Sequence, residues 1–79
     1  MNIQLIKGHF KASEGIELIT QMIHVKIKFL EGKIAGDSSE EDIKMREKRI
    51  KQLQKDLFEA RKHLEQASGL VDIHAEIEI

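Results

Sequence analysis

Four histidines are the residues of this 79-residue chain best suited to metal or proton chemistry. If the two helices identified below pair antiparallel about their loop, His63 comes near Lys11 and within reach of His9. Two imidazoles and a carboxylate, here Glu59 or Glu65, form a ligand set that zinc accepts. The spacing of these residues matches no recognised ligand motif. We therefore predict no metal site and no bound cofactor.

Hydroxyl side chains are the remaining source of a nucleophile in a chain without cysteine. The candidates are Ser13, Ser38, Ser39, Ser68 and Thr20. None of them stands in a pattern that would also supply a general base and the group that orients it. The five glycines lie singly or at element ends, so none builds a phosphate-binding loop. We predict no catalytic residue and no enzymatic activity.

A run of basic residues in the second half of the chain has two interpretations. It contains Lys44, Arg46, Lys48, Arg49, Lys51 and Lys55, with Glu47 as its only acid. A basic helix face can follow a phosphate backbone. The same run is typical of a solvated helix face, because acids such as Glu40 and Glu47 precede lysines by four residues, the favourable order. No aromatic residue interleaves with the charges, so we favour the solvated face and expect no nucleic-acid partner.

The composition indicates a helical domain with a small hydrophobic core. One domain spanning residues 1–79 is at the lower limit of what a single hydrophobic core stabilises. Cysteine is absent, which excludes disulfides and thiolate metal sites as supplements. Apolar residues make up 41% and charged residues 34%, a mixture typical of long amphipathic helices. Small domains of this kind usually gain stability by oligomerising.

Membrane and export signals are not evident in the sequence. The uncharged stretch from Leu18 to Val25 is far too short to span a bilayer. The N-terminal residues 1–7 lack a basic segment followed by an apolar one, so we expect no signal peptide. A formal net charge of −1 offers no attraction to anionic lipid. We expect no membrane partner and a cytoplasmic location.

The first helix is predicted over residues 14–35, with Ser13 as its N-cap. Two apolar seams follow its length. The first, which we assign to the core of the hairpin, contains Ile16, Ile23, Ile27, Leu30 and Ile34, with Ile19 beside it. The second contains Leu18, Met22, Val25 and Phe29 and lies roughly 150° away on the helical wheel. A helix with apolar seams on nearly opposite sides must be covered on both.

The second helix is predicted over residues 39–67, after a short connection at 36–38. Gly69 is well placed to end it in a left-handed conformation. Its apolar residues form one heptad-like stripe, which completes the core of the hairpin. The stripe contains Ile43, Ile50, Leu53, Leu57 and Leu64, with Ala60 and Ala67. Because the connection is short, we expect the two helices to pack antiparallel.

Short strands are predicted at both ends of the chain, at residues 2–7 and 70–79. The second alternates strictly, with Val71, Ile73 and Ile77 on the face expected to be buried. Both strands start or end at the same end of the hairpin, so we expect them to pair antiparallel. The predicted fold is α+β, dominated by helix, in the order β-α-α-β, and completed by oligomerisation because two strands alone are marginal in water.

These features favour a homo-oligomeric structural or protein-interaction module. A dimer is the expected state, and a different protein is a further candidate partner. The contact surface is predicted to combine the second seam with Val71, Ile73 and Ile77. An alternative is a small dimeric regulator that binds nucleic acid through the basic face of the second helix. A more distant alternative is a metal-binding protein or enzyme whose site lies between subunits.

Overall fold

The computed structural model describes residues 1–34 and 40–79, with the side chain of Ile34 left out. The elements are β1 (Asn2–Lys11), α1 (Ala12–Ile34), α2 (Glu40–Glu65) and β2 (Leu70–Glu78). The predicted β-α-α-β order, with a helical hairpin between two terminal strands, is confirmed. The predicted boundaries at residues 35 and 39 and the connection at 36–38 lie outside the described residues.

The helical hairpin buries the first seam of α1 against the single stripe of α2. Ile27, Leu30 and Leu64 are the buried apolar side chains among the described residues. The other members of the predicted hairpin core that the structure describes are half-buried. These are Ile16, Ile23, Ile43, Ile50, Leu53 and Leu57. Two helices joined by a short connection cover only one side of each other, so even this core is shielded from water on one side only.

The first helix begins two residues earlier than predicted, and its cap is a different residue. Ser13 lies inside α1, which starts at Ala12. The backbone N–H of Lys11 donates a hydrogen bond of 3.0 Å to Oε1 of Glu14. This is the reciprocal half of a capping box, in which the acid at the third helical position binds back to the residue before the helix. Lys11 is therefore both the last residue of β1 and the residue at the N-cap position of α1.

The second helix ends at Glu65, two residues before the predicted position. The backbone N–H of Ala67 still reaches the carbonyl of Leu64 at 3.1 Å, a tight final turn. Gly69 has a φ of 82°, as its predicted left-handed conformation requires. It turns the chain directly into β2 at Leu70.

The two strands form an antiparallel two-stranded sheet, as predicted. β1 is longer than the predicted residues 2–7, because Gly8 stays in the strand opposite Ile73 and pairing continues to Lys11 opposite Leu70. The register is interrupted once, between Gln4 and Ile6 of β1, where an extra residue bulges out. At the far end the backbone N–H of Ile79 donates to the carbonyl of Met1 at 2.7 Å, which closes the sheet at the chain termini.

Side chains of the sheet alternate between two faces. Phe10, Ile6, Val71, Ile73 and Ala75 are half-buried and form the inner face, toward α1. The opposite, outer face carries exposed polar side chains, among them Lys7, His9, Asp72, His74 and Glu76. Alternation of this kind is what a sheet with one covered face shows.

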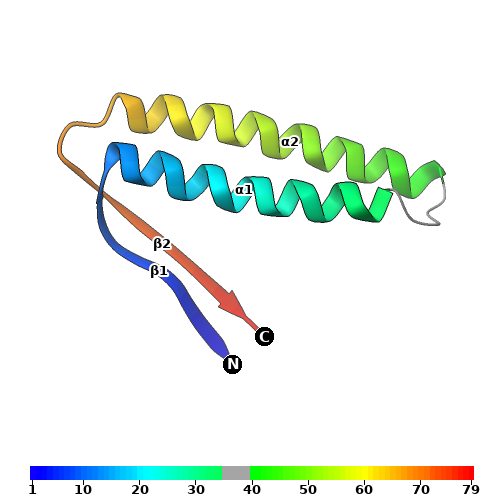
Figure 1. Cartoon of the computed structure of the whole chain (residues 1–79), viewed down its shortest axis with the longest axis horizontal. Coiled ribbons are helices and arrows are strands. Elements are labelled where there is room, and N and C mark those ends of the chain that lie inside the picture. The colour runs from blue at the N-terminus through cyan, green and yellow to red at the C-terminus, as the bar shows by residue number, and fades with distance from the viewer. Residues whose placement is uncertain (35–39) are drawn as a thin grey trace.

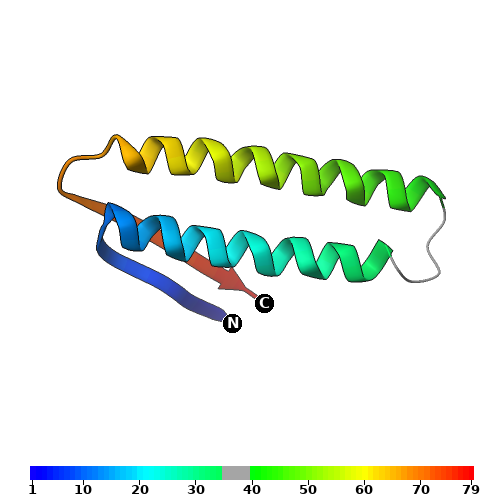
Figure 2. The ribbon, with the colours of Figure 1, turned by 45° about the horizontal axis from the view of Figure 1, so that its top comes forward.

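Helix α1 lies between α2 and the sheet, so the chain has three layers (Figures 1 and 2). The layers are held together at one end only, where β1 enters α1 and α2 leads into β2 (Figure 1). From there the strands diverge from α1, and we call the angle between helix and sheet the wedge (Figure 1). The extents along the principal axes are 46 × 32 × 13 Å, so the molecule is a flat plate.

This plate exposes far more surface than a compact chain of its mass. Its solvent-accessible surface is 6349 Å², against about 4,900 Å² expected for a compact monomer. Its radius of gyration is 15.0 Å, against about 11.6 Å expected for a domain of this length. The surplus of roughly 1,400 Å² exceeds the area of about 800 Å² that each partner contributes to a typical stable interface.

Candidate interaction surface

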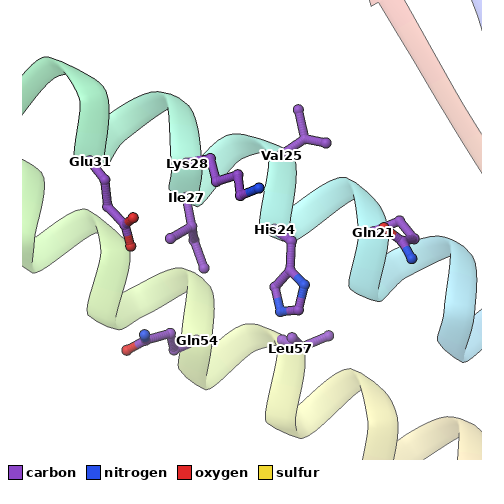
Figure 3. A pocket seen from close by; sticks show the side chains of 8 residues that line it. All are labelled: Gln21, His24, Val25, Ile27, Lys28, Glu31, Gln54 and Leu57. Atoms are coloured by element: carbon purple, nitrogen blue, oxygen red, sulfur yellow. The ribbon is translucent and has the colours of Figure 1, made fainter.

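The second seam of α1 lies on the side of the helix that faces away from α2. In the close view of Figure 3, Ile27 and His24 point from α1 toward α2, whereas Val25 points away from α2. Val25 is 68% exposed and Phe29 is 57% exposed. Met22 is also exposed, and Leu18 is half-buried. Val25 and Phe29, farther from the contact between helix and sheet, are therefore more exposed than Leu18 and Met22.

Phe29 is partly shielded by two lysines of its own helix. The Nζ atoms of Lys26 and Lys33 lie 5.3 and 5.5 Å from the centre of its ring. Cation–π contacts of this length contribute about 0.5–1 kcal/mol each at an exposed site. They leave the ring otherwise in water, so more than half of this large apolar side chain remains available for contact.

The inner face of the sheet mirrors this gradient. Val71 and Ile73 are half-buried near the start of α1, while Ile77 and Ile79 are exposed near the chain terminus. The seam of α1 and the inner face of the sheet are thus two apolar surfaces that meet near Gly15 and then separate. Together they form what we call the wedge surface: Leu18, Met22, Val25, Phe29, Val71, Ile73 and Ile77. The coverage of this surface by a partner stays a prediction.

An open groove also runs along one side of the hairpin, between α1 and α2 (Figure 3). His24, Ile27 and Leu57 are among its lining residues. Exposed polar groups, including Lys28 and Glu31, line much of the rest. We assign this open groove no function.

Two of the histidines, His9 and His74, lie together on the outer face of the sheet, whereas His24 and His63 lie on the helices. His9 lies on the outer face of the sheet, where Nδ1 contacts Oδ1 of Asp72 on β2. His63 is exposed on α2. Nε2 of His74 lies 3.9 Å from Oε2 of Glu76 on the same strand. Among the residues that the structure describes, no group of three or more His, Cys, Asp or Glu side chains could hold a metal ion.

The six residues of the predicted basic surface have different surroundings. Nη1 of Arg46 donates a hydrogen bond of 3.2 Å to the carbonyl of Lys33, so this half-buried side chain is turned toward the end of α1. Nζ of Lys44 lies 3.8 Å from Glu40 one turn earlier. The other four basic residues are exposed on α2: Lys48, Arg49, Lys51 and Lys55.

Several exposed apolar residues were not predicted as part of any surface, among them Phe58, Met45 and Leu5. Phe58 is 62% exposed on α2, with Nζ of Lys62 at 5.4 Å from its ring centre. Met45 is exposed on the same helix, and Leu5 is exposed at the bulge of β1. Phe58 and Met45 fall outside the heptad-like stripe, which is the signal that sets them apart in the sequence. Nothing in the sequence marks Leu5, because the bulge appears only when β1 pairs with β2.

Neither described helix is long and apolar enough to cross a lipid bilayer. Comparison of the chain with protein-family models, with curated proteins and with solved structures gave no match. The wedge surface is therefore the feature from which a function is inferred.

Proposed function

We propose that this chain is a self-associating structural or interaction module, with a homodimer as its basic unit. The observation that supports the proposal is the wedge surface, in which the large apolar side chains of Met22, Val25, Phe29 and Ile77 are exposed. Single exposed apolar residues are common on monomers, but contiguous apolar patches of several hundred Å² mark contact sites.

The small number of buried side chains supports the same conclusion. A folded chain must offset the conformational entropy of ordering about 79 residues, on the order of 1–2 kcal/mol per residue. The described residues include only three buried apolar side chains, and the chain has no cysteine for a disulfide. A second copy that covers the wedge surface would supply the missing burial, at roughly 25 cal/mol for each Å² of apolar area.

A second copy is the simplest occupant because the wedge surface is self-complementary in chemistry. Both of its walls are apolar, so a twofold axis can set the seam of one copy against the seam or the inner sheet face of the other. A different protein with an apolar face is the alternative occupant. The cytoplasmic location expected from the sequence stays a prediction.

Nucleic-acid binding is not favoured as a second function. Two of the basic side chains of α2 contact other groups of the same chain: Arg46 binds the carbonyl of Lys33, and Lys44 lies beside Glu40. The net charge of the whole chain is −1. We propose that any contact with a phosphate backbone is weak and depends on salt.

The proposal is tested by introducing a charge into the wedge surface. Val25→Glu would place a carboxylate in the covered seam, where desolvation without a partner is costly. Gln54→Glu on α2 adds the same charge at an exposed position outside the wedge surface. Sedimentation equilibrium should show that Val25→Glu is monomeric or unfolded and that Gln54→Glu assembles like the unaltered chain. A folded Val25→Glu variant with unchanged mass would refute the proposal.

A further inference from the structure

The two free edges of the sheet differ in their fitness to accept another strand. β1 has a bulge between Gln4 and Ile6, which interrupts its backbone ladder, and it carries Lys7 and Lys11. Bulges and lysines are the devices by which edge strands avoid pairing. β2 contains neither lysine nor arginine, and its residues from Leu70 to Ala75 pair with β1 without interruption. The outer edge of β2 is therefore the edge open to a further strand.

We propose that this edge pairs antiparallel with the same edge of a second copy, about a twofold axis at Ile73. The two sheets then become one sheet of four strands. This inference rests on the proposed self-association and adds to the wedge surface a second contact between the two copies, at the edge of the sheet.

The charges of β2 select the position of the axis. With the axis at Ile73, Asp72 of each copy stands opposite His74 of the other, and Leu70 stands opposite Glu76. An imidazole N–H can donate to a carboxylate, so each of the two symmetric Asp72–His74 pairs is attractive. Opposite charges on facing residues stabilise a strand pair, and like charges destabilise it.

At the neighbouring positions of the axis, acidic residues of the two copies face each other. An axis at His74 sets Asp72 against Glu76 twice, and an axis at Asp72 sets the two aspartates against each other. An axis at Ala75 sets Asp72 against Glu78 twice, which offsets the attraction of its two His74–Glu76 pairs. Ile73 is the position among these four that brings no two acids face to face.

The pairing also extends contacts that the single chain already makes. On the outer face, β1 sets His9 opposite Asp72 and Lys7 opposite His74. A row across the four strands would then read His9, Asp72, His74 and Lys7, with the last two from the second copy. Asp72 would then stand between two imidazoles. It already contacts one of them, His9, within the single chain.

The spacing of the helices is compatible with this sheet. Helix α1 lies over the inner face near Gly15. The centres of the two strand pairs would lie two strand spacings apart, about 9.6 Å, so α1 helices centred over their own strand pairs would be separated by the same distance. Helices pack at about 8–10 Å, so the first turns of the two α1 helices could lie side by side on the same face. Four strands would also replace a two-stranded sheet, which is marginal in water on its own.

Charge substitutions on the exposed outer face test the pairing, and the readout is the dimer dissociation constant from sedimentation. His74→Glu should weaken the dimer about tenfold, because two attractive pairs become repulsive. The double variant Asp72→Lys/His74→Glu should recover most of that loss, since the new lysine of each copy would face the new glutamate of the other. Both replaced side chains are exposed in the single chain, so the variants should fold.

Glu76→Lys is the matched control that reports the axis. With the axis at Ile73, residue 76 faces Leu70 and the dissociation constant should change less than about twofold, as expected where no charged pair is altered. Tighter association would place the axis at His74, weaker association at Ala75, and either result would overturn the proposal. If dissociation constants of all these variants equal that of the unaltered dimer, the edge pairing is wrong while the self-association stands. A monomeric unaltered chain would instead refute the proposed function itself.

Cysteine cross-linking gives an independent measurement in a chain without cysteine. Facing Cα atoms in an antiparallel pair lie about 4.5–5.5 Å apart, within the range that a disulfide spans. A mixture of Asp72→Cys and His74→Cys chains should form the mixed disulfide readily under mild oxidation. A mixture of Asp72→Cys and Glu76→Cys chains should not. Equal yields from the two mixtures, or the reverse order, would contradict the axis at Ile73.

Discussion

Ile73 of β2 lies directly against Gly15 of α1: a Cβ atom added to Gly15 would stand 3.0 Å from Cδ1 of Ile73. It would also stand 3.4 Å from Cγ2 of Val71 and 3.6 Å from Cδ1 of Leu64. The sheet, α1 and the end of α2 thus meet at a point where a Cβ atom would fit only if Ile73 moved by a few tenths of an ångström. This contact fixes where the wedge opens.

The first prediction compares alanine at two helical glycines. Gly32 has no neighbour within 4 Å of an added Cβ, so Gly32→Ala should raise the free energy of unfolding by up to about 1 kcal/mol. Gly15→Ala should be at least about 1 kcal/mol less stable than Gly32→Ala, because crowding at Ile73 offsets the helix propensity. Chemical denaturation of both variants measures the difference. Equal gains would show that the sheet is not seated on Gly15.

The second prediction compares the two exposed phenylalanines. Phe29 and Phe58 are similarly exposed, and each has a lysine near its ring. Only Phe29 belongs to the wedge surface. If a partner copy buries it, Phe29→Ala should cost about 3–5 kcal/mol per chain. Phe58→Ala should stay near the range of about 0.5 kcal/mol typical of surface substitutions. Denaturation at a concentration that favours assembly separates the two, and comparable losses would argue against a covered seam.

The third prediction concerns the two faces of β2. Ile73→Lys should destabilise the fold severely, because the new charge would lie between the sheet and α1. Glu76→Lys on the exposed outer face should leave the unfolding free energy nearly unchanged. Thermal unfolding of the two variants is sufficient to decide. Similar losses in both would mean that the two faces of the strand are assigned wrongly.

The fourth prediction concerns the basic residues of α2. Any binding to random duplex DNA should be weak and should fall steeply as salt rises, because it depends on the release of counterions. Fluorescence anisotropy with a labelled duplex at two salt concentrations measures this dependence. Tight, sequence-selective binding near physiological salt would favour the regulator alternative over the interaction module.

Periodicity predicted much of this fold because each element has a pattern of its own. The alternation in β2 and the seams at Ile27 and Leu57 specify element type from local spacing alone. The extension of β1 through Gly8 to Lys11 was not predicted, since its continuation depends on pairing with β2 rather than on its own residues. The cap at Lys11 was missed for a similar reason: Ser13 has the stronger intrinsic preference, and the entry of the strand overrides it.

The wedge itself could not be read from the sequence. Two seams on α1 indicated that the helix is covered on both sides, but local spacing does not give the direction in which the sheet leaves the helix beyond its contact at Gly15. The bulge that exposes Leu5 and weakens the β1 edge likewise exists only in the paired sheet. These two features decide which surface remains for a partner.

The most direct test of the central claim is the mass of the unaltered chain in solution, measured by sedimentation equilibrium across a wide range of concentration around the micromolar level. The surplus of exposed surface and the open wedge predict a species of at least two chains, with a melting temperature that rises with concentration. A compact monomer of constant mass, with the same melting temperature at every concentration, would contradict the account.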